Sequence, residues 1–235
     1  MTFFLLYAVH FLDTYEDAFV RKEDEHKTFH FAHGSNGTLT KNEVLAGAIL
    51  SSIVFLILLF FIAQGEPVLF HVLVLGGYVL GVLYSPFLSK NLVTSLLIPP
   101  VGVILGMASA FLLAGGMNWD LFTSFAISVF LLMLGGKAWM DIADQDADAF
   151  TKRDNIALLW GEKNARLLAH GTILAGFLLS LMRTHSWGHH IGIVIIALLF
   201  FRGFSMTAKR GTHWIMPAIF LFLIWEIAVQ ILVIP

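Results

Sequence analysis

Long apolar runs separated by short polar connections dominate this chain. Seven of the runs approach the roughly 20 apolar residues that a tilted membrane-spanning helix needs. They occupy residues 44–63, 67–88, 93–115, 120–140, 164–182, 188–204 and 213–234. We therefore predict an all-α, polytopic membrane helical bundle that forms a single transmembrane domain over residues 1–235.

A shorter apolar run, residues 1–12, does not reach the length of a membrane span. No basic segment precedes it and no small-residue cleavage site follows it, so it is not predicted to be a signal peptide. We expect this run to be the second half of a helix. The predicted bundle then has seven full spans plus a partial N-terminal helix.

The composition agrees with a membrane protein. Hydrophobic residues make up 58% of the chain and charged residues only 13%. Soluble domains usually carry about 25% charged residues. The chain has no cysteine, which excludes disulfides, thiol nucleophiles and Cys-based zinc sites.

Two long polar stretches, residues 13–43 and 141–163, interrupt the apolar pattern. If successive spans alternate in direction, both stretches lie on the same side of the membrane. Twelve of the 14 Lys and Arg residues belong to that side: Arg21, Lys22, Lys27, Lys41, Lys90, Lys152, Arg153, Lys163, Arg166, Arg202, Lys209 and Arg210. Lys137 lies near the same side, one turn before Asp141, and only Arg183 falls on the opposite side. Because cytoplasmic loops are rich in Lys and Arg, we predict that both acidic loops are cytoplasmic.

The second polar stretch opens with closely spaced aspartates. Asp141, Asp144 and Asp148 are spaced i, i+3, i+7, which places their side chains on one stripe of a continuous helix. Their mutual repulsion is relieved if a divalent cation lies among them. Mg²⁺ prefers oxygen ligands and often completes its shell with phosphate. Lys152 and Arg153 follow and are suited to phosphate oxygens. The pattern favours a Mg²⁺–diphosphate site over the alternative, a solvated acidic loop.

The segment from Met140 to Leu168, "MDIADQDADAFTKRDNIALLWGEKNARLL", resembles the second aspartate-rich motif of the UbiA superfamily of intramembrane prenyltransferases. The matching positions are Asp141, Asp144 and Asp148, then Lys152 and Arg153, and then Gly161. The stretch "GVLYSPFLSK" resembles the Tyr-Ser and Lys element of a middle helix in that family, with Tyr84, Ser85 and Lys90 at the matching positions.

The stretch "HFLDTYEDAFVRKEDEHK" is the counterpart of the family's first aspartate-rich motif. Asp13 fits its first Asp and Glu16 its second, whereas Val20 stands at the third. Asp17 or Asp24 is a substitute only if the helix shifts. The family typically has nine helices, and the part without a counterpart here is the first helix and the start of the second. The resemblance therefore implies either that the true start lies upstream or that this is a truncated member.

The resemblance implies an enzyme that transfers a prenyl group from a polyprenyl diphosphate to a small acceptor, possibly aromatic, within the membrane. Mg²⁺ is the implied cofactor, and the implied partners are these substrates and the lipid bilayer, with no nucleic acid. The implied metal ligands are Asp13, Glu16, Asp141, Asp144 and Asp148. The implied catalytic residues are Asp141, Asp144, Asp148, Lys152, Arg153 and Tyr84, and the implied substrate-binding residues are Asp13, Glu16, Asp17, Arg21, Lys90 and Asn155.

Two expectations about geometry follow from the resemblance. The two acidic clusters are expected to face one another across a cavity at the cytoplasmic end. The ring of Tyr84 is expected to stabilise an allylic carbocation through its π face, although a tyrosine of the interfacial belt is an equally good interpretation.

Several alternatives stay open. A prenyl diphosphate cyclase or a prenyl-phosphate glycosyl-type transferase of the same superfamily uses similar motifs, and the incomplete first motif also allows an inactive member. A small cation or solute transporter is the alternative from a different class. It predicts ionisable residues near the middle of the membrane, where the sequence places only His71, Glu226 and Gln230.

Overall fold

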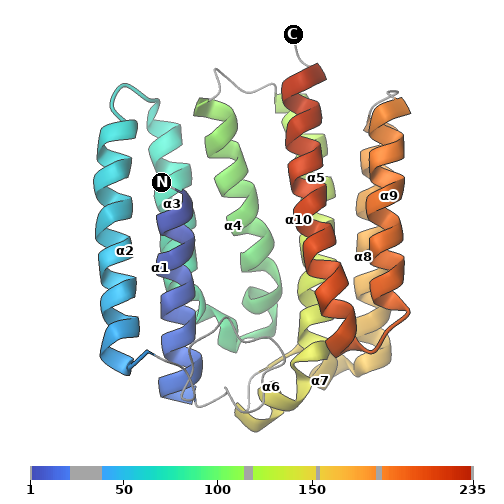
Figure 1. Cartoon of the computed structure of the whole chain (residues 1–235), viewed down its shortest axis with the longest axis horizontal. Coiled ribbons are helices and arrows are strands. Elements are labelled where there is room, and N and C mark those ends of the chain that lie inside the picture. The colour runs from blue at the N-terminus through green and yellow to red at the C-terminus, as the bar shows by residue number, and fades with distance from the viewer. Residues whose placement is uncertain (1, 22–38, 114–118, 152–153, 184–186, 234–235) are drawn as a thin grey trace. The chain divides into compact units, whose positions relative to one another are not determined.

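The computed structural model describes residues 2–21, 39–113, 119–151, 154–183 and 187–233. Over these residues the chain is helical and contains no strand (Figure 1). The elements are α1 (Thr2–Tyr15), η1 (Glu16–Arg21), α2 (Lys41–Ile62), α3 (Val68–Tyr84), η2 (Leu88–Lys90), α4 (Leu92–Leu113), α5 (Trp119–Ala143), α6 (Gln145–Thr151), α7 (Ile156–Trp160), α8 (Glu162–Arg183), α9 (Trp187–Phe204) and α10 (Ala208–Val233).

Five helical segments are long and apolar enough to cross a membrane, namely α2, α4, Phe122–Ala143 of α5, Glu162–Met182 of α8, and α9. They fit an integral membrane protein, as the composition predicts. The run at 67–88 forms α3, a shorter apolar helix of 17 residues, and the first short run forms α1. Five of the seven predicted spans therefore correspond to helices that are long and apolar enough to cross a membrane. The count of seven stays a prediction.

The chain divides into two compact units. The first contains residues 1–116 and 146–154, and the second contains residues 117–145 and 155–235. The division separates α5 from α6, so the second polar stretch contributes to both units. The predicted single domain over the whole chain stays a prediction.

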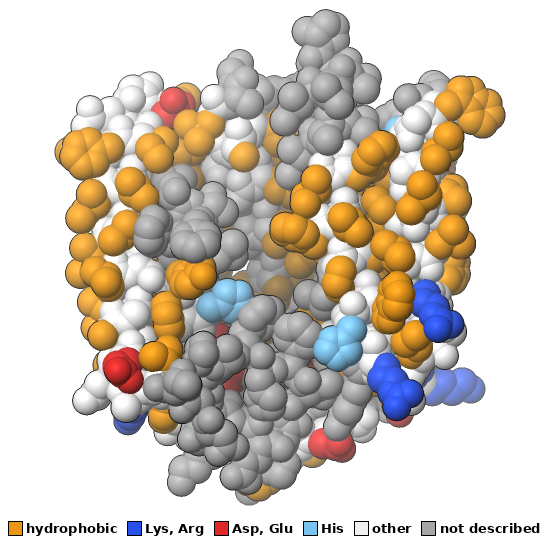
Figure 2. Space-filling view, viewed as in Figure 1, with side chains coloured by type: hydrophobic (Ala, Val, Ile, Leu, Met, Phe, Trp, Pro, Cys, Tyr) orange, Lys and Arg blue, Asp and Glu red, His pale blue; other side chains and the backbone are white. Residues whose placement is uncertain are grey.

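In the first unit, α1 packs against α2 and α3, and α3 packs against α4. Phe11 of α1 lies against Gly47 of α2, and Val9 of α1 lies against Gly81 of α3. Between α2 and α3 the buried core consists of Phe55, Leu59, Ala63, Phe70 and Val74, with the Phe55 ring stacked on Tyr78 at a centroid distance of 5.0 Å. Other faces of α2 expose apolar side chains, which is how helices in lipid are built (Figure 2).

In the second unit, glycines let the helices approach closely. A Cβ atom at Gly135 of α5 would lie 2.8 Å from the backbone oxygen of Ala169 in α8. A Cβ atom at Gly211 of α10 would lie 2.5 Å from the backbone oxygen of Gly203 in α9. Small residues at such contacts are typical of helix packing in membranes. They fix α5 against α8 and α9 against α10.

We predict that this close packing makes α8 sensitive to a single methyl group at Gly176. A Cβ atom there would lie 2.8 Å from Leu132 Cγ and 2.9 Å from the backbone oxygen of Ser128. Gly176→Ala is therefore expected to lower the free energy of unfolding by about 1–3 kcal/mol. Thermal unfolding in detergent micelles measures the change.

Gly171→Ala is the matched control in the same helix, because nothing lies within 4 Å of a Cβ atom there. It is expected to leave stability unchanged or to raise it by up to about 1 kcal/mol through helix propensity. Equal unfolding temperatures for the two variants would show that α5 and α8 are not in such close contact.

Candidate functional site

Asp141, the first residue of the second acidic motif, lies in the last turn of α5 and is only 2% exposed. Lys137, one turn earlier, donates a hydrogen bond to Asp141 Oδ1 and forms an ion pair with it. The other carboxylate oxygen, Oδ2, is buried and has no hydrogen-bond partner among the described residues. A buried carboxylate oxygen without a donor is a suitable ligand position for a cation.

The helix is interrupted at Asp144, three residues after Asp141. The Asp144 N–H donates to the Met140 carbonyl at 2.9 Å, α5 ends at Ala143, and α6 begins at Gln145. The single continuous helix on which the sequence analysis based its carboxylate stripe is therefore broken at Asp144. Aspartate is a poor residue for a helix interior because its side chain competes for backbone hydrogen bonds.

The aspartates of this motif differ in exposure and in the unit to which they belong. Asp144 is half-buried and belongs to the second unit with Asp141. Asp148 is 4% exposed and belongs to the first unit, on α6. Asp146, which the spacing sets apart from the other three, is exposed. Lys152 and Arg153 lie outside the described residues.

Asn155 connects the polar loop to the end of α5. Its side-chain Oδ1 caps α7 by accepting from the Leu158 N–H at 3.0 Å. Its Nδ2 donates to the backbone carbonyl of Asp141 at 2.7 Å. Asn155 is 1% exposed, so both bonds are shielded from water. The resemblance implies substrate binding for this residue, which stays a prediction. In the structure its side chain bonds the Asp141 backbone.

Trp139 fixes the same turn of α5 from the opposite side. It is fully buried, and its indole Nε1 donates to the Ala208 carbonyl at 3.3 Å. The guanidinium of Arg166 lies 5.1 Å from its ring centroid, a cation–π distance, and the Arg166 side chain also pairs with Glu162 at 2.7 Å. Sequence reasoning missed this cluster, because Trp139 and Arg166 are far apart in the chain.

The first acidic motif begins at the end of α1. Asp13 and Glu16 are half-buried, and Asp17 is 4% exposed. From Glu16 to Arg21 the chain forms a π-helix, η1, whose wider turn changes the residue register relative to an α-helix. This is the kind of helix shift that the sequence analysis required for Asp17 to act in the motif. The Arg21 side chain and Asp24 lie outside the described part of the chain.

The Tyr-Ser element lies where α3 ends. Tyr84 is half-buried, and its hydroxyl donates to the Ser95 carbonyl of α4 at 3.3 Å. Ser89 Oγ donates to the Ser85 carbonyl at 2.8 Å, which closes the turn between α3 and η2. Lys90 is exposed, with its ammonium 6.0 Å from the Phe87 ring centroid. Tyr84 and Lys90 thus belong to one structured turn of the first unit.

The structure brings Lys137, Asp141 and Asn155 together in the second unit. Asp13, Glu16 and Asp17 lie near one another in the first unit because they are close in sequence. Over the described residues, no three Asp, Glu or His side chains converge as a set of metal ligands. The expectation that the two acidic clusters face one another across a cavity stays a prediction.

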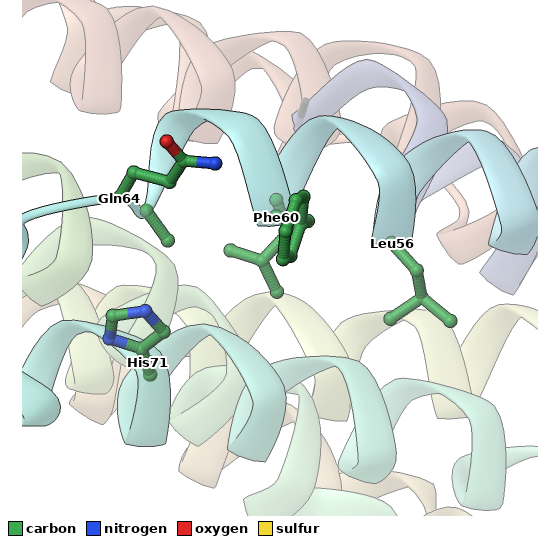
Figure 3. Close-up of a pocket in the computed structure, with 6 residues that line it drawn as sticks. Leu56, Phe60, Gln64 and His71 are labelled. Carbon is green, nitrogen blue, oxygen red and sulfur yellow. The ribbon is translucent and has the colours of Figure 1, made fainter.

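Each unit also has an apolar pocket along its helices. In the first unit a pocket of about 320 Å³ lies between α2 and α3, where Phe60 of α2 and Gln64, just beyond the end of α2, face His71 of α3 (Figure 3). The His71 ring bonds the Pro67 carbonyl at 3.1 Å, near the start of α3. In the second unit a pocket of about 290 Å³ lies between α8 and α9. Neither pocket is lined by a residue of the acidic motifs.

We predict that Asn155 contributes to stability through its two hydrogen bonds. Asn155→Ala removes the cap of α7 and leaves the Asp141 carbonyl without its donor, so the free energy of unfolding is expected to fall by about 1–3 kcal/mol. Asn164→Ala is the control, because Asn164 also bonds a backbone carbonyl, that of Trp160 at 2.8 Å, but on the exposed surface. It is expected to change stability by less than about 0.5 kcal/mol. Equal losses in chemical unfolding would contradict the proposed link to α5.

Comparisons of this chain with protein-family models, curated proteins and solved structures found no match. The case for a function therefore depends on the motifs of the sequence and on the geometry of the described residues.

Proposed function

We propose that the chain is a Mg²⁺-dependent prenyltransferase that moves a prenyl group from a polyprenyl diphosphate to a small acceptor within the membrane. One observation carries the proposal. At the end of a membrane-spanning helix, Asp141 is buried with one carboxylate oxygen paired to Lys137 and the other without a hydrogen-bond partner in the described chain. A cation at Oδ2 would use the lone pairs that no hydrogen bond occupies, and it is a natural partner for a diphosphate.

The residues of both acidic motifs have distinct roles in this proposal. Asp141, Asp144 and Asp148, together with Asp13, Glu16 and Asp17, would hold Mg²⁺. The cation would neutralise the diphosphate and stabilise it as a leaving group. Lys152, Arg153, Arg21 and Lys90 would bind phosphate oxygens as charged donors. Lys137 keeps the Asp141 carboxylate in place, and Asn155 keeps its backbone in place.

The proposed reaction is a substitution at the first carbon of the prenyl chain. The allylic C–O bond breaks, and the electron pair leaves with the diphosphate. The electron-rich acceptor then forms a bond to the carbocation and releases a proton. The ring of Tyr84, fixed between α3 and α4 by its bond to Ser95, would stabilise the cation through its π face.

We also propose that α3 and α10 join the five apolar helices to give seven crossings, with α1 as a partial helix. The connections before α2 and after α5 would then be cytoplasmic, because the Lys and Arg residues gather on that side. The acidic motifs would lie at the inner rim of the membrane, where a diphosphate can stay in water while its tail lies in lipid.

The activity is tested with a radiolabelled prenyl diphosphate and Mg²⁺ in vesicles that contain the purified protein. We expect pyrophosphate release and a prenylated product from the unaltered protein. Asp141→Asn is expected to reduce the rate by about 100-fold or more, because it removes a charged metal ligand. Analysis of the product separates transfer from cyclisation and from phosphosugar transfer.

Glu162→Gln is the matched control, a carboxylate near the same end of the second unit that is 52% exposed and pairs with Arg166. It is expected to retain the activity. Absence of any prenyl diphosphate turnover by the folded, unaltered protein, or equal loss in both variants, would refute the assignment of Asp141.

The proposed topology is testable by single cysteines, because the chain contains none of its own. Glu162→Cys at the start of α8 is expected to react with a membrane-impermeant maleimide only from the cytoplasmic side. Gln64→Cys, beyond the end of α2, is expected to react only from the opposite side. Labelling of both cysteines from one side would contradict the alternating topology.

One observation favours a second candidate function, a small-cation or solute transporter. Its prediction of ionisable groups within the spans agrees with the burial of His189 and Glu226 beside one another in the second unit. Ion flux across the same vesicles without diphosphate turnover would favour this function over prenyl transfer.

A further inference from the structure

An apolar groove runs between α8 and α9, which lie side by side in the second unit (Figure 1). Its floor consists of buried side chains, among them Ile173 and Phe177 from α8 and Phe200 from α9. Its rims are side chains that are at least half exposed, such as Leu174 and Phe201. Both helices are long and apolar enough to cross a membrane, so the open side of the groove faces the hydrocarbon of the bilayer.

The groove has the length of a lipid chain in one leaflet. On α8 it extends from His170 to Leu181, eleven residues along the helix, which corresponds to about 16 Å. One leaflet contributes about half of the hydrocarbon core, which is roughly 30 Å thick. An acyl chain of the surrounding bilayer therefore matches the groove in length and in polarity.

The face of α8 that lines the groove changes from apolar to charged near the start of the helix. Lys163 and Arg166 precede His170 by seven and four residues, a spacing that places all three on one face. On α9, Arg202 directly follows the groove residue Phe201. Figure 2 shows hydrophobic side chains above Lys and Arg side chains on the right of the molecule, where Figure 1 places α8 and α9. One end of the groove is thus positively charged.

Arg166 keeps hydrogen-bond donors for a ligand although it pairs with an acid. Its Nε donates to Glu162 Oε1 at 2.8 Å, and its Nη2 lies 2.7 Å from the same oxygen. A guanidinium carries five N–H groups, so the Nη1 group is available for a phosphate oxygen. The Trp139 ring, 5.1 Å from the guanidinium, helps to hold it in place. Lys163 and Arg202 are exposed, and their charges offset that of Glu162.

His170 lies at the boundary between the charged and the apolar part of this face. Its ring packs against Phe204 and Trp139, with centroid distances of 4.1 and 5.7 Å. No hydrogen bond joins this ring to another described residue, and its Nε2 is buried. A neutral imidazole always carries one N–H, and neither aromatic ring offers it an oxygen. An ester or phosphate oxygen of a lipid, one helical turn beyond Arg166, would supply the missing acceptor.

We propose that the groove between α8 and α9 binds an anionic phospholipid of the bilayer. One acyl chain lies in the groove from His170 to Leu181, and the phosphate lies beside Arg166 and Lys163, with Arg202 at the α9 rim. The groove is open to the bilayer along its length, so lipids of the bilayer fill it. The cations at its end favour a head group with a net negative charge over a zwitterionic one. The site is independent of the proposed prenyl transfer, because no residue of the acidic motifs lines it.

The test titrates the purified, full-length protein in detergent micelles with phosphatidylglycerol and, separately, with phosphatidylcholine of the same chain length. Native mass spectrometry counts the bound lipids and gives the affinity of each. We expect the first phosphatidylglycerol to bind at least about tenfold more tightly than the first phosphatidylcholine. Glycerophosphoglycerol, the same head group without acyl chains, is expected not to displace the bound lipid.

Two charge variants test the phosphate end of the site. Arg166→Gln and Lys163→Gln are each expected to weaken the binding of phosphatidylglycerol about fivefold and to leave that of phosphatidylcholine unchanged. Lys163 is exposed, so its substitution leaves the packing of α8 intact. Arg210→Gln is the charge-matched control, because Arg210 is exposed on α10 and does not belong to this face of α8. It is expected to leave both affinities unchanged.

A separate variant tests the acyl-chain end. Ala197 lines the groove on α9, so Ala197→Phe fills the space of at least two methylene groups of the lipid. It is expected to weaken the binding of phosphatidylglycerol by about tenfold. Leu198→Phe is the control, because Leu198 is exposed on the same helix but does not line the groove. It is expected to retain the affinity of the unaltered protein.

Four results would overturn the proposal. Equal affinities for the two lipids would show that the cations do not select a charge, and displacement by glycerophosphoglycerol would show that no chain is bound. Equal effects of a variant and its control would show that the lipid binds elsewhere. Displacement of the lipid by an equal concentration of geranylgeranyl diphosphate would show that the groove takes a prenyl diphosphate. Prenyl transfer is measured separately, so a failure of either proposal leaves the other standing.

Discussion

The polar centres of this protein depend on one constraint, which is that they bury carboxyl groups among apolar helices. A charge removed from water destabilises the folded state strongly unless it is paired and hydrogen-bonded. Asp141 meets this constraint through Lys137, and Glu226 meets it through Ser180 and His189. In each centre one helix supplies the acidic side chain. The nearest partner of Asp141 lies one helical turn away, and that of Glu226 lies on a neighbouring helix.

Close packing in the second unit holds these groups in position. Gly135 and Gly176 bring α5 and α8 together, and a Cβ atom at Gly211 would lie 2.8 Å from the Trp139 ring. Trp139 therefore packs tightly against α10, and the Arg166 guanidinium lies over the face of its ring. Asp141, two residues later, projects from a different face of the same turn. The packing of Trp139 on one face of α5 thus fixes the direction in which the Asp141 carboxylate projects from another face.

The second unit has two polar centres with different characters. The centre at Asp141 adjoins the polar loop, and its free carboxylate oxygen suits a ligand that arrives from water. The centre at Glu226 is fully buried, with Ser180 hydrogen-bonded to both His189 and Glu226. A metal-bound diphosphate is the ligand that we propose for the first centre.

The sequence by itself determined that the chain is helical and membrane-embedded, because apolar runs of this length require backbone hydrogen bonds within a helix. It also identified the two acidic motifs. Only the tertiary structure decided that the helix breaks at Asp144, that η1 widens to a π-helix, and that Asn155 bonds the Asp141 backbone. It alone joined Ser180, His189 and Glu226, because contacts between three helices depend on how those helices pack, and local residue patterns do not encode that packing.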